Sequence, residues 1–249
     1  MIFIAIILGL IQGITEFLPI SSSGHLVLVE KLFGIECDFT LLNVILHLAT
    51  LFAVILYYRK VILYLICHPF CKMNKFLLIA TLPAVIFVLL FHSFIDNYLS
   101  SSIFLGIGFI LSAIFIYLGV SIPRNTSPQS LKYSNVLIMG ISQAFAIFPG
   151  LSRSGTTLCF GLLAGVERQS ALDFSFLMSI PIILASLIYE VFSSPVDSIE
   201  PVSAIISFVT AFITAFLTIK LMKKIIKNKA LLYFVPYLIL LGILSFVLI

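Results

Sequence analysis

The chain has 249 residues, of which 61% are hydrophobic and only 10% are charged, and its mean hydropathy is +1.25. Soluble proteins carry roughly 45–50% apolar and about 25% charged residues, so this composition excludes a soluble globular domain and predicts an all-α polytopic membrane protein. The net charge is +4, but no basic tract has the density of a nucleic-acid-binding patch, which excludes nucleic acid as a partner.

The first polar feature in this apolar chain is the stretch GLIQGITEFLPISSSGH, residues 9–25. Gln12 and Glu16 are four residues apart and share one helix face, and Pro19 is predicted to end that helix. A turn rich in serine and glycine follows, and His25 opens the next apolar run. A glutamate inside a membrane segment is energetically costly, so Glu16 indicates a functional site.

The stretch GISQAFAIFPGLSRSGTT, residues 140–157, repeats this pattern in the second half of the chain. Three pairs share an offset of 131 residues (140 − 9), namely Gly9 with Gly140, Gln12 with Gln143, and Gly24 with Gly155. Paired broken apolar segments indicate a membrane binding site between two halves. The first copy carries Glu16 and His25 whereas the second carries Arg153, which favours one shared site with divided roles.

Most of the other apolar segments are long enough to cross a bilayer, which needs about 20 residues. The predicted spans are residues 41–58, 76–95, 103–122, 172–192, 202–219 and 231–249. Eleven of the fourteen Lys and Arg residues lie in three of the loops between them, residues 59–75, 123–132 and 220–229. None lies in the alternate loops, residues 35–40, 96–102 and 193–201. Because basic loops stay inside, the first set is predicted to be cytoplasmic.

This loop pattern requires each broken stretch to enter and leave the membrane on one side. Residues 1–34 are predicted to dip in from the outside and residues 133–168 from the inside, each as a re-entrant helical hairpin. The predicted fold is a single membrane domain, residues 1–249, with an inverted-topology repeat whose halves are residues 1–122 and 133–249. Each half has one hairpin plus three transmembrane helices, and the two hairpin tips meet in a polar cavity.

The predicted tips have the chemistry of an anion site. Serine is a favoured N-cap, and two helix N-termini together with the Arg153 guanidinium suit a phosphate-like anion. Glu16 does not fit such a site unless a cation lies between the charges, so we expect Mg²⁺ or Ca²⁺ held by Glu16 and Gln12. Ser22 and His25 add a nucleophile and a proton carrier.

Simpler roles for the same residues stay open. The serines could be packing residues of membrane helices, Glu16 and Arg153 a buried structural pair, and His25 a donor to a backbone carbonyl. His47, in the segment NVILHLAT, is expected to be structural rather than catalytic. A transporter or flippase for an anionic lipid or solute would need the anion site but no nucleophile.

At these residues the chain resembles the undecaprenyl pyrophosphate phosphatase family, the bacitracin-resistance type of bacterial membrane phosphatase. The first family motif has a glutamate or glutamine, three residues, a glutamate and a serine-rich turn ending in Gly-His, which Gln12, Glu16 and PISSSGH match. The second motif, PGxSRSGxT, matches residues 149–157. The similarity runs through the chain and includes DFSFLMSIP at residues 173–181.

The resemblance implies a hydrolase that converts undecaprenyl pyrophosphate to undecaprenyl phosphate and inorganic phosphate, which recycles the carrier lipid of the cell wall. It also implies a divalent cation and an active site open to the outer side of the bacterial cytoplasmic membrane. A homodimer stays open.

The favoured mechanism has Ser22 attack the terminal phosphorus with His25 as its base, helped by Glu16 and Arg153. Attack by His25 itself or by water stays open. The expected substrate-binding residues are Ser21, Ser23, Gly24, Ser152, Ser154, Gly155 and Thr157.

Overall fold

The computed structural model describes residues 2–33, 40–94, 102–122, 130–193 and 200–248, and these residues fold into helices joined by turns. Five segments are long and apolar enough to cross a membrane, namely α5 (Lys72–Phe94), α6 (Ser102–Ser121), α9 (Arg168–Ser193), α10 (Pro201–Ile225), and η2 (Lys229–Tyr233) with α11 (Phe234–Leu248). The bent pair α3 (Thr40–Tyr57) and α4 (Arg59–Cys67) would make a sixth. The predicted polytopic all-α membrane protein is confirmed.

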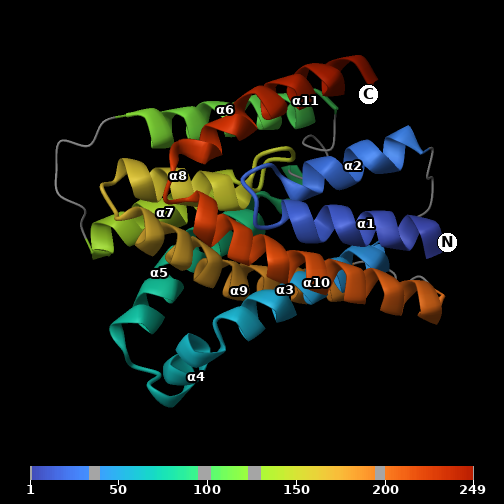
Figure 1. Ribbon diagram of the computed structural model, residues 1–249. Coiled ribbons are helices and arrows are strands. Elements are labelled where there is room, and N and C mark those ends of the chain that lie inside the picture. Colours follow the sequence, from blue (N-terminus) through green and yellow to red (C-terminus); the bar gives the residue numbers. More distant parts are fainter. Residues whose placement is uncertain (1, 34–39, 95–101, 123–129, 194–199, 249) are drawn as a thin grey trace.

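Both motif stretches form helical hairpins. In the first, a turn joins α1 (Ile2–Thr15) to α2 (Ser22–Leu32), and in the second a turn joins α7 (Tyr133–Phe145) to α8 (Arg153–Leu163). The longest of these four helices has 14 residues, or about 21 Å, which is short of the roughly 30 Å hydrocarbon core. The hairpins extend from opposite ends of the bundle and their turns meet near its centre (Figure 1).

The first helix of each hairpin packs closely on a long helix of the other half. α1 lies along α10, where Gly9 is closest to the Ser207 carbonyl and also approaches Ala211, and α7 lies along α5, where Gly140 approaches Ala80. A methyl group added at either glycine would lie 2.8 Å from backbone of the facing helix. Small residues permit this approach. The two alanines are themselves 131 residues apart (211 − 80), so the packing follows the motif repeat. The inverted topology stays a prediction.

The turn between α1 and α2 is anchored by aromatic packing. Phe17 is fully buried and meets Phe176 of α9 edge to face, with ring centroids 5.1 Å apart. Such a pair contributes about 0.5–1.5 kcal/mol beyond the area that it buries. This contact fixes the residue that directly follows Glu16.

Most of the helix ends that carry lysine or arginine gather at one end of the bundle, on the left and lower left of Figure 1. They are α4, the starts of α5, α7 and α9, and the end of α10. There Asp173 of α9 pairs with Lys223 of α10 at 2.8 Å and accepts a 2.5 Å hydrogen bond from Tyr58, which lies between α3 and α4. The start of α1 and the ends of α2 and α11 lie at the opposite end.

Candidate active site between the hairpin tips

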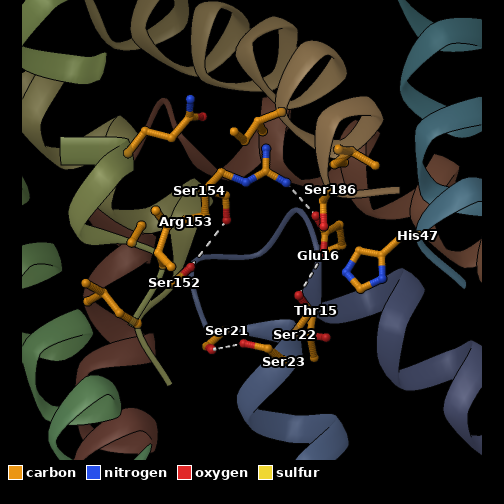
Figure 2. Close-up of a pocket in the computed structure, with 16 residues that line it drawn as sticks. Thr15, Glu16, Ser21, Ser22, Ser23, His47, Ser152, Arg153, Ser154 and Ser186 are labelled. Carbon is orange, nitrogen blue, oxygen red and sulfur yellow. Dashed lines mark hydrogen bonds and ion pairs between the residues drawn. The ribbon is translucent and has the colours of Figure 1, made fainter. Parts of the chain in front are cut away.

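A cavity of about 200 Å³ lies where the two tips meet. Its walls include seven of the residues predicted for the site, namely Glu16, Ser21, Ser22, Ser23, Ser152, Arg153 and Ser154. Figure 2 shows the serines of the first tip facing those of the second across this space. Ile182 and Ile183 of α9 add an apolar wall. The prediction that the two tips share one polar cavity is confirmed.

The Glu16 carboxylate lies at the centre of the site and accepts hydrogen bonds from three side chains. Arg153 Nη2 lies 2.5 Å from Oε1, while Ser22 Oγ at 2.6 Å and Gln12 Nε2 at 3.1 Å donate to Oε2. The Glu16 side chain is only 5% exposed and that of Arg153 is 18% exposed. Removing one partner of a buried ion pair costs about 3–5 kcal/mol, so this pair also supports the fold.

The starts of α2 and α8 are built alike. Ser21 and Ser152 are the N-caps, and their hydroxyls accept hydrogen bonds from the Gly24 and Gly155 amides at 3.3 and 3.1 Å. In the described part of the chain, four backbone N–H groups at these helix starts have no acceptor, those of Ser22, Ser23, Arg153 and Ser154. Helix N-termini with free N–H groups bind anions, so two such sites converge on the cavity.

Unusual backbone conformations lie beside both helix starts. Ser21 has φ +68°, the one positive value among the described residues other than glycine. Gly150 has φ +79°, and a methyl group added there would lie 2.2 Å from the Leu105 carbonyl oxygen. A non-glycine residue in such a conformation costs about 1–3 kcal/mol and is typical of functional sites. The tips are joined by the Ser154 hydroxyl, which donates to the Leu18 carbonyl at 3.0 Å.

His25 does not line the cavity, and the structure does not bring it to Ser22 as a base. Its Nδ1 donates to the Ser21 carbonyl at 2.7 Å, and its Nε2 accepts from the Tyr237 hydroxyl of α11 at 2.7 Å. The spacing of three residues predicted a Ser22–His25 pair, but Ser22 turns back to Glu16 and His25 turns to α11. The carbonyl-donor role left open for His25 is the one observed.

Four other predicted residues lie around the cavity rather than on its wall. Thr157 donates to the Arg153 carbonyl at 2.9 Å and contacts the Ser175 hydroxyl, so its side chain is not presented to an anion. Gly24 packs on Phe109 and Gly155 packs on Pro19. Gln12 is fully buried behind Glu16, and its Oε1 has no hydrogen-bond partner in the described residues.

The cavity is also lined by four polar residues that were not predicted for the site. They are Thr15 of α1, His47 of α3, Gln143 of α7 and Ser186 of α9. The His47 ring is drawn beside Glu16 in Figure 2. The expectation that His47 has only a structural role does not account for this position. An ionisable residue inside an apolar span is by itself a sign of function, and that signal would have found it.

A divalent cation fits this site only together with phosphate oxygens. Among the described residues no cluster of three or more His, Cys, Asp or Glu is suited to a metal, and of the described residues on the cavity wall Glu16 alone is a carboxylate. Mg²⁺ is often bound by one or two carboxylates, waters and substrate phosphates. Glu16, the Ser22 hydroxyl and the unpartnered Gln12 Oε1 offer the hard oxygen donors that such an ion prefers.

Fold and site together define a multi-pass helical membrane protein with a polar cavity between two hairpin tips. The chain belongs to the bacitracin resistance protein BacA family, whose model matches residues 5–244. It is 38% identical over 244 residues to undecaprenyl-diphosphatase 3 of Bacillus cereus, covering 96% of this chain and 94% of that one. It is 39% identical over 249 residues to the undecaprenyl-diphosphatase of Thermosipho melanesiensis, covering 98% of each. The predicted family is confirmed.

Proposed function

We infer that this protein hydrolyses undecaprenyl diphosphate to undecaprenyl phosphate and inorganic phosphate. The observation that carries the inference is a serine hydroxyl, Ser22, bonded to a buried carboxylate, Glu16, in a cavity whose other tip presents Arg153 and a helix N-terminus. These are the parts of a phosphoryl-transfer site, with a nucleophile, a base and positive charge for the phosphate. The names of the relatives agree with it.

The diphosphate is bound in the cavity by the two helix starts and by Arg153. The four free N–H groups and the guanidinium supply donors where negative charge develops on the transferred phosphate. A single donor of this kind is often worth about 10²–10³ in rate. Arginine also matches two phosphate oxygens at once, which lysine does not. The isoprenoid tail leaves past apolar residues such as Ile182 and Ile183.

Ser22 is the nucleophile and Glu16 is its base. Ser22 Oγ lies 2.6 Å from Glu16 Oε2, within reach for proton transfer. The bond from Ser22 Oγ to the terminal phosphorus forms as the bridging bond to the lipid phosphate breaks, and the Ser22 proton passes to Glu16. His25 acts here as a positioning residue, because it holds the Ser21 carbonyl directly before the nucleophile.

A divalent cation would be held by Glu16 together with the phosphate oxygens. When bound, it would neutralise part of the diphosphate charge. The unpartnered Gln12 Oε1, on the side chain that donates to Glu16, would be a further oxygen donor to such an ion. This supports the expected need for Mg²⁺ or Ca²⁺.

The site opens to the outer side of the cytoplasmic membrane, and the two halves have inverted topology. The clustering of basic residues at one end of the bundle supports this orientation, and the repeated packing at Gly9 and Gly140 supports the repeat. In a cysteine-free background, a cysteine replacing Glu200 should react with an impermeant thiol reagent added outside intact cells. A cysteine replacing Asn228 should not react, and the reverse pattern would contradict the orientation.

Phosphate release by purified protein in detergent tests the function itself, because no gradient exists there and a transporter would release none. We expect release from undecaprenyl diphosphate that stops on addition of a chelator and returns with excess Mg²⁺ or Ca²⁺. Absence of release with intact, monodisperse protein would favour the anionic-lipid transporter instead.

A further inference from the structure

We propose that His47 is a further catalytic residue of this site, which activates the water that hydrolyses phosphoserine on Ser22. The proposal rests on the phosphatase function inferred above and completes its second half-reaction. His47 comes from α3, outside both hairpins, and lines the cavity beside Glu16 (Figure 2). It is only partly buried, so solvent in the cavity can reach its ring.

The backbone of α3 sets the tautomer of the His47 ring. Nδ1 lies 2.8 Å from the Asn43 carbonyl oxygen, one helical turn earlier. A carbonyl oxygen only accepts hydrogen bonds, so the neutral ring carries its proton on Nδ1 and has a lone pair on Nε2. Within the described residues Nε2 has no hydrogen-bond partner. The ring is therefore oriented as a base with its accepting nitrogen unused.

The other candidate bases are already engaged. Both ring nitrogens of His25 are taken, by the Ser21 carbonyl and the Tyr237 hydroxyl, and the ring lies outside the cavity. Both Glu16 oxygens accept hydrogen bonds, and in the proposed mechanism Glu16 holds the Ser22 proton during the intermediate. Among the described side chains that line the cavity, His47 is left as the free proton acceptor.

Hydrolysis of the phosphoserine needs water as its only further reactant. A water oxygen attacks the phosphorus of phosphoserine, so the bond from water oxygen to phosphorus forms as the bond from phosphorus to Ser22 Oγ breaks. One water proton passes to His47 Nε2. Glu16 returns its proton to Ser22 Oγ, which restores the nucleophile. His47 then loses its extra proton to solvent, and inorganic phosphate leaves the cavity.

A structural role and a catalytic role of His47 predict different kinetics for the variant His47→Gln. Glutamine is polar and of similar size but cannot take the proton. We expect phosphoserine to form within about threefold of the wild-type rate while steady-state turnover falls at least about 100-fold, because general base catalysis contributes 10²–10⁴. Phosphoenzyme should then accumulate to about one per active site. The experiment is rapid acid quench with undecaprenyl diphosphate labelled in its terminal phosphate.

His68→Gln is the matched control. His68 makes the same kind of Nδ1 contact to the carbonyl one turn earlier, that of Tyr64, but it is exposed directly after α4 and does not line the cavity. Its substitution should leave turnover and phosphoenzyme level unchanged. If His47→Gln also turns over within about threefold of wild type, or if it loses phosphoserine formation together with turnover, the proposal is wrong.

A second variant covers the case in which His47→Gln does not fold. His47→Ala leaves room for added imidazole, which should restore turnover at least about tenfold in monodisperse protein; no recovery would overturn the proposal. Failure of the phosphatase function is distinguishable, because then wild-type protein itself releases no phosphate from the lipid. Turnover without any trapped phosphoserine in wild type or His47→Gln would overturn the His47 step while leaving the phosphatase function intact.

Discussion

The two hairpin tips share a backbone design and differ in chemistry. Each has a serine N-cap, Ser21 or Ser152, and each helix start leaves free N–H groups toward one cavity. Ser22 and Arg153 occupy the same position of the repeat (153 − 131), yet one is a hydroxyl and the other a cation. Both bind Glu16, whose repeat position is Ile147 on the second tip.

A duplicated backbone element can thus form one asymmetric site. A helix N-terminus binds an anion whatever side chains surround it, so the shared backbone design supplies a symmetric anion site. The side chains then divide the remaining work: the first tip carries the carboxylate and the nucleophile, and the second carries the fixed positive charge. Replacing residues at matched positions of the two tips therefore tests the division directly.

The largest effect is expected for Ser22→Ala. Removing a nucleophile costs about 10⁴–10⁶ in kcat, so turnover should fall at least about 10⁴-fold while Arg153 still binds the lipid. Phosphate release and lipid binding measure the two effects separately. Ser186→Ala, which also removes a hydroxyl from the cavity wall, should stay within about threefold of wild type. Equal losses of turnover in the two variants would show that Ser22 is not the nucleophile.

Arg153→Lys tests the second tip with its charge kept. Lysine lacks the planar fork that matches two phosphate oxygens, so we expect kcat to fall about 10²–10³-fold. Arg168→Lys, at the start of α9 and away from the cavity wall, is the control and should leave kcat unchanged. Near-full turnover of Arg153→Lys at saturating lipid would mean that Arg153 and Glu16 form a buried structural pair, the alternative left open by the sequence.

Tyr237→Phe tests whether the hydrogen bond from Tyr237 to His25 holds the first tip in position. The Tyr237 hydroxyl donates to His25 Nε2 at 2.7 Å, and His25 in turn donates to the Ser21 carbonyl. Phenylalanine keeps the ring stacking but loses the donor, so kcat should fall about 5–10-fold with KM within twofold. Tyr233→Phe, which changes an exposed tyrosine, should change neither. If KM rises and kcat does not change, Tyr237 contributes to lipid binding and does not position the first tip.

The smallest effect is expected for Gln12→Glu, with the same change at its repeat partner Gln143 as the comparison. Each is a buried amide whose Oε1 has no hydrogen-bond partner in the described residues. Gln12→Glu places a second carboxylate beside Glu16, so half-maximal activity should need about fivefold less Mg²⁺. Gln143→Glu has no neighbouring carboxylate on the cavity wall of its own tip and should not lower the Mg²⁺ requirement. A similar shift in both variants would contradict a cation on the Glu16 side.

Local patterns in the sequence were enough to predict much of this architecture. The offset of 131 residues led to two matched helix starts and to tips that meet at Glu16 and Arg153. The two helix N-termini predicted at the tips are observed, with α2 beginning at Ser22 and α8 at Arg153. Serine capping and hydropathy depend on neighbouring residues, so the chain itself carries that information.

Contacts between distant segments could not be predicted this way. His25 and Tyr237 are 212 residues apart, and which ring faces which helix depends on how α2 packs against α11. Spacing along a helix shows which residues share a face, but the hydrogen-bond partner of each depends on the tertiary contacts that surround it. His47 lies in an apolar span, which indicates a function from sequence alone, but only the position of α3 beside the first tip shows that it lines this cavity.

Trapping the transferred phosphate tests most directly whether Ser22 of the first tip is the nucleophile and Arg153 of the second tip supplies the positive charge. Wild-type protein mixed with terminally labelled undecaprenyl diphosphate and quenched in acid should give a phosphoserine ester, and mass spectrometry should place it on Ser22. The label should be stable in acid, labile in base, absent in Ser22→Ala and much reduced in Arg153→Lys. An acid-labile, base-stable label that persists in Ser22→Ala and disappears in His25→Ala would instead make His25 the nucleophile and contradict the account.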